Sequence, residues 1–162
     1  MRAHRQRLIA LYGILLVLLL GADVARRELA LASGETILLA LAPVDPRSLM
    51  QGDYMRLDYA ISRELRTLPT PPASLVVRID PQRVAHWLPG ADPQTLAADE
   101  RRLQPMHQTQ IGPDAYFFEE GEAKLLEQAR YGEFRLSKEG RMQLIGLADA
   151  AGKPLGQRRE RW

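Results

Sequence analysis

The sequence predicts an α+β protein: an N-terminal transmembrane helix, then a mainly antiparallel β-sheet domain with one main helix. Two observations support this prediction. An almost wholly apolar run begins at Leu8 and continues to Ala25, with arginines on both sides. Beyond residue 34, short apolar or alternating segments are separated by Gly, Pro and Asp, which is typical of antiparallel strands. The same pattern allows the sheet to curl towards a barrel.

Composition divides the chain into three parts. Residues 1–34 hold a cytoplasmic tail, the transmembrane segment and a short stalk, residues 35–156 form the β-rich domain, and residues 157–162 form a basic tail. Although the pI is near 9.1, residues 28–157 carry 14 basic and 18 acidic side chains, a net charge of −4. This acidic body argues against a nucleic-acid partner. The chain has no cysteine, which excludes disulfides and thiolate catalysis.

The N-terminal apolar run fits either a cleaved signal peptide or an uncleaved signal anchor. Cleavage near Ala22 or Ala25 would place Leu20 or Asp23 where a small residue is required, so the anchor is favoured. More positive charge lies before the run than after it, which favours a cytoplasmic N-terminus. In a bacterium, the protein would then be a single-pass inner-membrane protein, with residues 8–25 in the lipid bilayer and its body in the periplasm.

The first half of the body reads as strands and turns. Residues 36–42 are continuously apolar and predict a central strand covered on both faces. A helical turn is expected between Asp45 and Gly52. From Tyr54 the alternation predicts a strand with its odd-numbered residues, 55 to 61, facing the core. Residues 74–79 and 83–87 predict two joined strands, and residues 89–100 a long loop.

The second half contains the predicted main helix. Residues 103–111 suggest an edge strand, because Pro105 cannot donate to a ladder. Residues 121–131 predict a helix with Leu125 and Ala129 facing inward. Residues 133–137 and 141–148 then predict a hairpin around Gly140.

Several separated segments of the chain resemble one bacterial protein family. Gly52, Asp53, Tyr54, Leu57 and Tyr59 match every fixed position of the GDYXXLXY motif. Residues 43–47, 116–121 and 129–135 also look like that family, so the resemblance covers roughly residues 35–149. It implies a membrane-anchored protein, often encoded beside multi-pass membrane proteins, and it implies no catalytic residues.

Four residues are candidates for a binding site: Asp53, Tyr54, Glu119 and Arg130. For Asp53 and Tyr54 the competing interpretation is structural, as a loop acceptor and a sheet-surface side chain. Arg130 and Arg135 could instead meet the acidic cluster at residues 119–122 as a structural network. The aromatic residues at 116–118 are expected to fill the core.

Catalytic chemistry is weakly supported. Ser48 before Gly52 and Asp53 is similar to the serine of bacterial signal peptidases, which is activated by a buried lysine. The three lysines, however, lie on the predicted helix or in turns. His86 and His107 belong to separate segments, so neither a metal site nor another cofactor is expected. The sequence therefore favours a non-enzymatic accessory subunit of an integral membrane protein, with a small-ligand-binding domain and a serine–lysine peptidase as the alternatives.

Overall fold

The computed structural model describes residues 11–25, 34–42, 50–51, 54–119, 121–156 and 158. Residues 11–25 are helical, and their side chains are exposed. Among all the residues that the structure describes, no helix is both long enough and apolar enough to cross a membrane. Of the helical turn predicted between Asp45 and Gly52, residues 45–49, which include the candidate nucleophile Ser48, and residue 52 lie outside the described residues. Met50 and Gln51 at its end form a strand instead of a helical turn.

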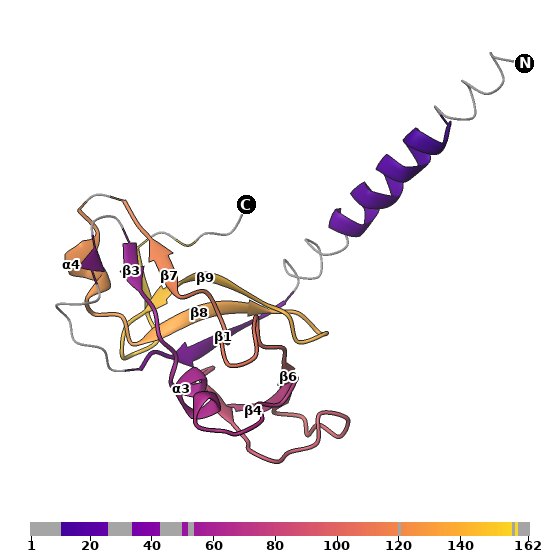
Figure 1. Cartoon of the computed structure of the whole chain (residues 1–162). Helices are drawn as coiled ribbons and strands as arrows, with labels where there is room; N and C mark the ends of the chain where they lie inside the picture. Colours follow the sequence, from indigo (N-terminus) through magenta and orange to yellow (C-terminus); the bar gives the residue numbers. More distant parts are fainter. Residues whose placement is uncertain are drawn as a thin grey trace, which may run out of the picture.

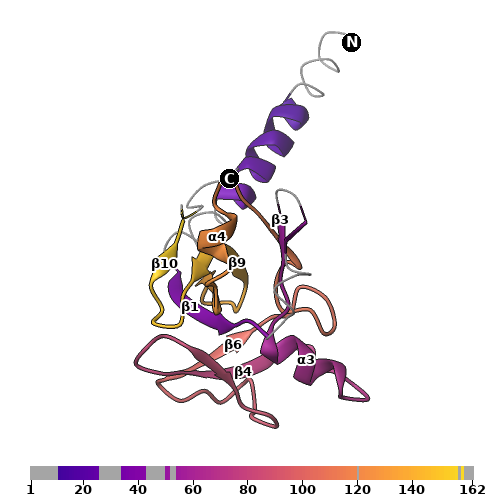
Figure 2. The same cartoon turned by 90° about the vertical axis from the view of Figure 1, so that its left-hand side faces the viewer.

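Within its described residues, the body consists of three antiparallel sheets and two short helices (Figures 1 and 2). The main sheet curls into a half-barrel and has the strand order β1 (Glu35–Ala40), β8 (Tyr131–Leu136), β9 (Met142–Ala148), β10 (Pro154–Leu155). The second sheet has the order β5 (Ala85–Trp87), β4 (Leu75–Ile79), β6 (Glu100–Leu103). The third has the order β2 (Met50–Gln51), β3 (Tyr54–Arg56), β7 (Ala115–Phe117), and the helices are α3 (Ala60–Arg66) and α4 (Ala123–Leu126). The predicted α+β class with mainly antiparallel sheets is confirmed.

Strand β1 is buried on both faces, as its continuous apolar sequence predicts. Ile37 and Leu39 face the main core, while Leu38 points the other way and packs with Val84 and Ala148. The Leu38 N–H donates to the Arg83 carbonyl at 2.8 Å, which ties the main sheet to the second sheet. The strand lies at the edge of its own sheet, so the predicted central position is wrong. Its second face is covered by the neighbouring sheet instead.

Both predicted hairpins are present. Strands β4 and β5 pair antiparallel, and so do β8 and β9. The second hairpin turns at Gly140, which has a φ of 88°. A side chain there would also place its Cβ 2.6 Å from the Arg102 carbonyl oxygen, so glycine is required twice over.

The predicted strand from Tyr54 is shorter than expected, because a helix takes over at Ala60. The predicted inward residues are nevertheless all buried: Met55, Leu57, Tyr59 and Ile61. Ile61 and Leu65 are one helical turn apart, and both face the core. Buried positions therefore follow the two-residue spacing of a strand up to Ile61 and the four-residue spacing of a helix from Ile61 to Leu65. Helix α3 was not predicted, and the body has two helices within the described residues.

Two further predictions need correction. Helix α4 covers only Ala123–Leu126, because residues from Tyr131 onward pair in β8. Leu126 is fully buried, whereas Leu125 is exposed, so the inward stripe was misplaced by one residue although Ala129 is buried as predicted. The edge strand predicted at residues 103–111 is also misplaced, because strand β6 covers Glu100–Leu103 and ends where the predicted strand begins.

Strand β7 was not predicted either. Residues 115–117 pair with β3, and of the aromatic run only Tyr116 is fully buried. Phe118 packs partly against the core, and Phe117 is 59% exposed. The expectation that this run fills the core therefore holds only in part, because a strand turns successive side chains to opposite faces.

Candidate functional site

A polar cleft of about 250 Å³ opens beside the end of the family motif. One wall comes from the chain between β3 and α3, and the other from the loop that precedes β7. The cleft is lined by Leu57, Asp58, Tyr59, Ser62, Arg66, Thr109, Gln110, Gly112 and Asp114. Its volume lies below the roughly 300–1,000 Å³ of drug-sized pockets, so it suits a ligand of few atoms.

Tyr59 forms the floor of this cleft. Its ring is 2% exposed, and its hydroxyl donates to the Pro113 carbonyl at 3.0 Å. Burial, reinforced by the negative charge of Asp114, raises the pKa of Tyr59 far above its ordinary value. Tyr59 therefore stays neutral and acts as a hydrogen-bond donor to the opposite wall, not as a proton-transfer group.

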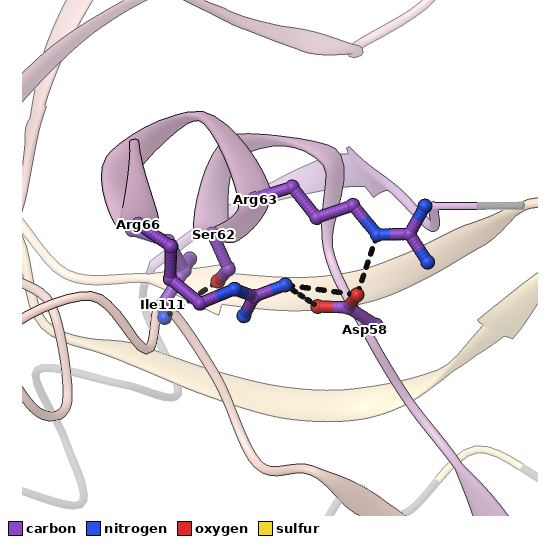
Figure 3. A network of polar contacts seen from close by, with 5 residues as sticks. All are labelled: Asp58, Ser62, Arg63, Arg66 and Ile111. Carbon is purple, nitrogen blue, oxygen red and sulfur yellow. Dashed lines mark hydrogen bonds and ion pairs between the residues drawn. The ribbon is translucent and has the colours of Figure 1, made fainter. Parts of the chain in front are cut away.

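Asp58 forms ion pairs with two arginines of α3 (Figure 3), of which Arg66 lines the cleft. Its carboxylate accepts from the Nε of Arg63 at 2.6 Å and from the Nη2 of Arg66 at 2.9 and 3.0 Å. Partial burial opposes ionisation of Asp58, but the hydrogen bonds from both arginines outweigh it, and the pKa of Asp58 is lowered. This carboxylate is therefore ionised and engaged, which makes it a poor general base.

Ser62 joins α3 to the opposite wall. Its Oγ accepts the Ile111 N–H at 3.1 Å, and both residues are 2% exposed (Figure 3). The hydroxyl satisfies a buried backbone donor that would otherwise be unpaired. The hydrogen bonds of Tyr59 and Ser62 thus join the two walls of the cleft.

The catalytic alternatives find little support in the described residues. Lys124, Lys138 and Lys153 are all exposed, whereas a lysine that acts as a base needs burial. His86 lies in β5 and pairs with Asp80 at 2.9 Å, away from His107. In the described ranges, no three His, Cys, Asp or Glu side chains are grouped to hold a metal ion.

Of the four candidate binding residues, Tyr54, Glu119 and Arg130 are not among those that line the cleft. Asp53, like Gly52 and Glu120, lies outside the described residues. Tyr54 is half-buried in β3, and its ring lies 5.8 Å from that of Phe117. The Glu119 N–H donates to the Glu122 carboxylate at 3.2 Å.

Among the described residues, Arg130 and Arg135 donate to backbone carbonyls and not to Glu119 or Glu122 of the acidic cluster, while Glu120 lies outside the described residues. The Arg130 guanidinium donates to the carbonyls of Glu127 and Ala129, and Arg135 donates to the carbonyl of Gly34. These side chains stabilise the backbone at the start of β8 and β1, because a carbonyl there lies within reach of the fork-shaped guanidinium.

Sequence reasoning missed the polar residues that line the cleft, notably Asp58, Ser62 and Asp114. A signal for part of the set was present: Arg63 and Arg66 are three residues apart, which places them on one face of a helix. Because the sequence predicts a strand and not a helix just before these arginines, their three-residue spacing was not interpreted as a shared helix face. The loop that supplies Asp114 is far away in sequence, and only the pairing of β3 with β7 brings it near.

These features define a small α+β domain with a polar surface cleft beside its family-motif strand. The chain belongs to the GDYXXLXY protein family, whose model matches residues 16–147. No curated protein and no solved structure matches the chain. Within the motif, Leu57 and Tyr59 line the cleft, while Tyr54 lies on the third sheet.

Proposed function

We propose that this protein is a single-pass protein of the bacterial inner membrane and an accessory subunit of an integral membrane protein. Residues 8–25 anchor it, the N-terminus is cytoplasmic, and the β-rich body acts in the periplasm through protein contacts without catalysing a reaction. The apolar run and its flanking arginines support the anchor and its orientation. The multi-pass protein expected from the family resemblance is the natural partner.

One observation favours a protein-contact role over catalysis. Phe117 is 59% exposed on β7, and its ring packs against Tyr54 of the family motif. Exposed aromatic side chains backed by a rigid strand are enriched at protein interfaces. Within the motif, Tyr54 thus contacts the exposed Phe117, whereas Leu57 and Tyr59 line the polar cleft.

Site-specific crosslinking tests the partner. A photoreactive amino acid at Phe117 in the full-length protein should capture one integral membrane protein in cells, and that protein should co-purify in detergent. The control position is Leu96, which is 41% exposed in the loop before β6. Equal capture from both positions, or capture of no membrane protein, would contradict the proposed role.

A reporter that is active only in the periplasm tests the orientation. Fused after Trp162, it should be active. A silent but expressed fusion would place the body in the cytoplasm and would reverse the proposed topology.

A small-ligand-binding domain is the second candidate, and the polar cleft is the observation that favours it. A panel of small polar metabolites should then raise the melting temperature of the parent protein, and Arg66→Gln should weaken that shift. The matched control is Arg78→Gln, because Arg78 is 54% exposed, close to the 48% of Arg66, but lies on β4 outside the cleft. If no compound shifts the parent, the cleft is not a ligand site.

The serine–lysine peptidase is the remaining alternative. Peptide cleavage that is lost in Ser48→Ala, with folding intact, would support it. We expect the Ser48→Ala protein to behave as the parent does.

A further inference from the structure

One wall of the polar cleft carries a carboxylate that the domain does not use for its own structure. Asp114 is exposed and lines the cleft from the loop directly before β7. Its backbone carbonyl accepts the Leu57 N–H at 2.8 Å, which attaches this residue to the family-motif segment. Among the described residues, no hydrogen bond and no ion pair engages the Asp114 carboxylate. After burial, its negative charge is the second cause of the raised pKa of Tyr59, so the carboxylate lies near the cleft floor.

The other wall supplies a guanidinium that is only partly engaged. Arg66 is the last residue of α3 and lines the cleft, with 48% of its side chain exposed. Only its Nη2 donates to Asp58 (Figure 3), and within the described part of the chain its Nε and Nη1 donate to no other group. These remaining N–H groups can donate to a ligand while the pair with Asp58 stays intact.

The fixed charges of the two walls have opposite signs and balance. The Asp58 carboxylate pairs with the guanidiniums of Arg63 and Arg66, so this group of side chains keeps one net positive charge. Asp114 adds one negative charge from the other wall. A ligand with a single charge is attracted to one wall and repelled by the other, whereas a ligand with both charges is attracted to both.

Two hydrogen bonds join the walls that carry these charges. The Tyr59 hydroxyl donates to the Pro113 carbonyl, and Ser62 Oγ accepts the Ile111 N–H. The walls are therefore joined before a ligand binds, and less binding free energy is spent on bringing the charged groups together.

The uncharged part of the lining suits a small and polar ligand. The half-buried Thr109 and Gln110 add a hydroxyl and an amide, each of which can both donate and accept hydrogen bonds. Leu57 is the single aliphatic side chain among the lining residues, and it is buried. The cleft of about 250 Å³ therefore offers charges and hydrogen bonds but little apolar surface.

We infer that the polar cleft binds a small zwitterion of the α-amino-acid class, with Arg66 binding the ligand's carboxylate and Asp114 binding its ammonium group. This inference rests on the small-ligand function proposed for the cleft and names the class of ligand. Both contacts are charge-assisted hydrogen bonds, which are stronger than those between neutral groups. Thr109 and Gln110 favour an amino acid with a short polar side chain.

Isothermal titration calorimetry of the full-length protein in a non-ionic detergent tests the ligand class. The probes are glycine, serine and glutamine, each compared with the amine that lacks its carboxylate and with the acid that lacks its amino group. For serine, these analogues are ethanolamine and hydroxypropanoate. At least one amino acid should bind about tenfold more tightly than both of its analogues, because each analogue loses a charge-assisted hydrogen bond.

Two charge-neutral variants assign the contacts. Arg66→Gln should weaken binding of the amino acid about tenfold without weakening binding of its amine. Asp114→Asn should weaken binding of the amino acid to a similar extent without weakening binding of its acid. Arg78→Gln and Asp99→Asn are the matched controls, since both residues are 54% exposed and lie outside the cleft, and they should bind as the parent does. Thermal unfolding checks that each variant is folded.

The outcomes separate this inference from the function on which it rests. If an amine, an acid or the neutral probe glycerol binds as tightly as every amino acid, the cleft is a ligand site but not one for zwitterions. Unchanged amino-acid binding in Arg66→Gln or in Asp114→Asn also overturns the inference. If no probe binds, glycerol included, the small-ligand function fails together with it.

Discussion

The rings of Tyr59 and Phe134 meet edge to face, with centroids 5.7 Å apart and planes inclined by 63°. Tyr59 closes the family motif, and Phe134 lies in β8 of the main sheet. Both rings lie against Gly112 and Gly132, where an added Cβ would fall 2.7 and 2.9 Å from Phe134 atoms. The last tyrosine of the motif therefore belongs to the core and, through its hydroxyl, braces the cleft.

Replacing Tyr59 should separate these two roles. Tyr59→Phe removes only the hydrogen bond to Pro113 and should lower the free energy of unfolding by about 1 kcal/mol. Tyr59→Ala also removes the buried ring and should cost about 3–5 kcal/mol. Denaturant unfolding of the two variants measures both values, and equal losses would show that the ring packing contributes nothing.

Gly112→Ala should destabilise the domain by about 1–3 kcal/mol, because the new methyl group would overlap two rigid aromatic rings. The matched control is Gly146→Ala, whose Cβ would meet its nearest neighbour at an ordinary 3.6 Å. Thermal unfolding of both proteins should show a clear drop in melting temperature only for Gly112→Ala. Similar drops would mean that the rings of Tyr59 and Phe134 move aside easily.

Asp58→Asn should make stability less dependent on acid pH. Because the folded-state pKa of Asp58 is lowered from 3.8, its stabilisation is fully present above that ordinary value and is lost as the pH falls through the folded pKa. At neutral pH the variant should lose about 1 kcal/mol, since the arginines are half-exposed. Parent and variant should converge as the pH drops below 3.8 in an unfolding series.

Asp99→Asn is the control for that series. Asp99 and its partner Arg78 are each 54% exposed, so this ion pair should contribute well under about 1 kcal/mol at any pH. A pH-independent difference between the parent and Asp58→Asn would show that the two arginines do not stabilise the charged carboxylate.

Ser62→Ala should cost about 1–3 kcal/mol, because the buried Ile111 N–H loses its acceptor. Thr67→Ala removes a hydroxyl at the end of the same helix, where Thr67 Oγ1 donates to the Glu64 carbonyl in an exposed position. Its cost should be smaller, since water can replace that bond. Chemical denaturation compares the two, and a larger loss for Thr67→Ala would contradict the bracing role of Ser62.

Much of the fold could be predicted from local pattern. The continuous apolar run of β1 and the two hairpins depend on neighbouring residues and turn glycines, and their positions were close to those found. Helix α3 could not be separated from a strand, because Tyr59, Ile61 and Leu65 fit either period over so short a segment. Strand β7 was missed because its three residues become a strand only by pairing with β3.

The sequence by itself determined the family, the antiparallel α+β class and the burial of Met55, Leu57, Tyr59 and Ile61, because these depend on residue type and spacing along the chain. Tertiary structure alone decided which polar residues share a place. Asp58 meets the loop of Gly112 and Asp114 only because β3 pairs with β7, and Glu133 meets Arg158 only because β10 returns beside β9. Contacts between distant segments leave no periodic signal, so the cleft and the Glu133–Arg158 ion pair form only once the sheets are assembled.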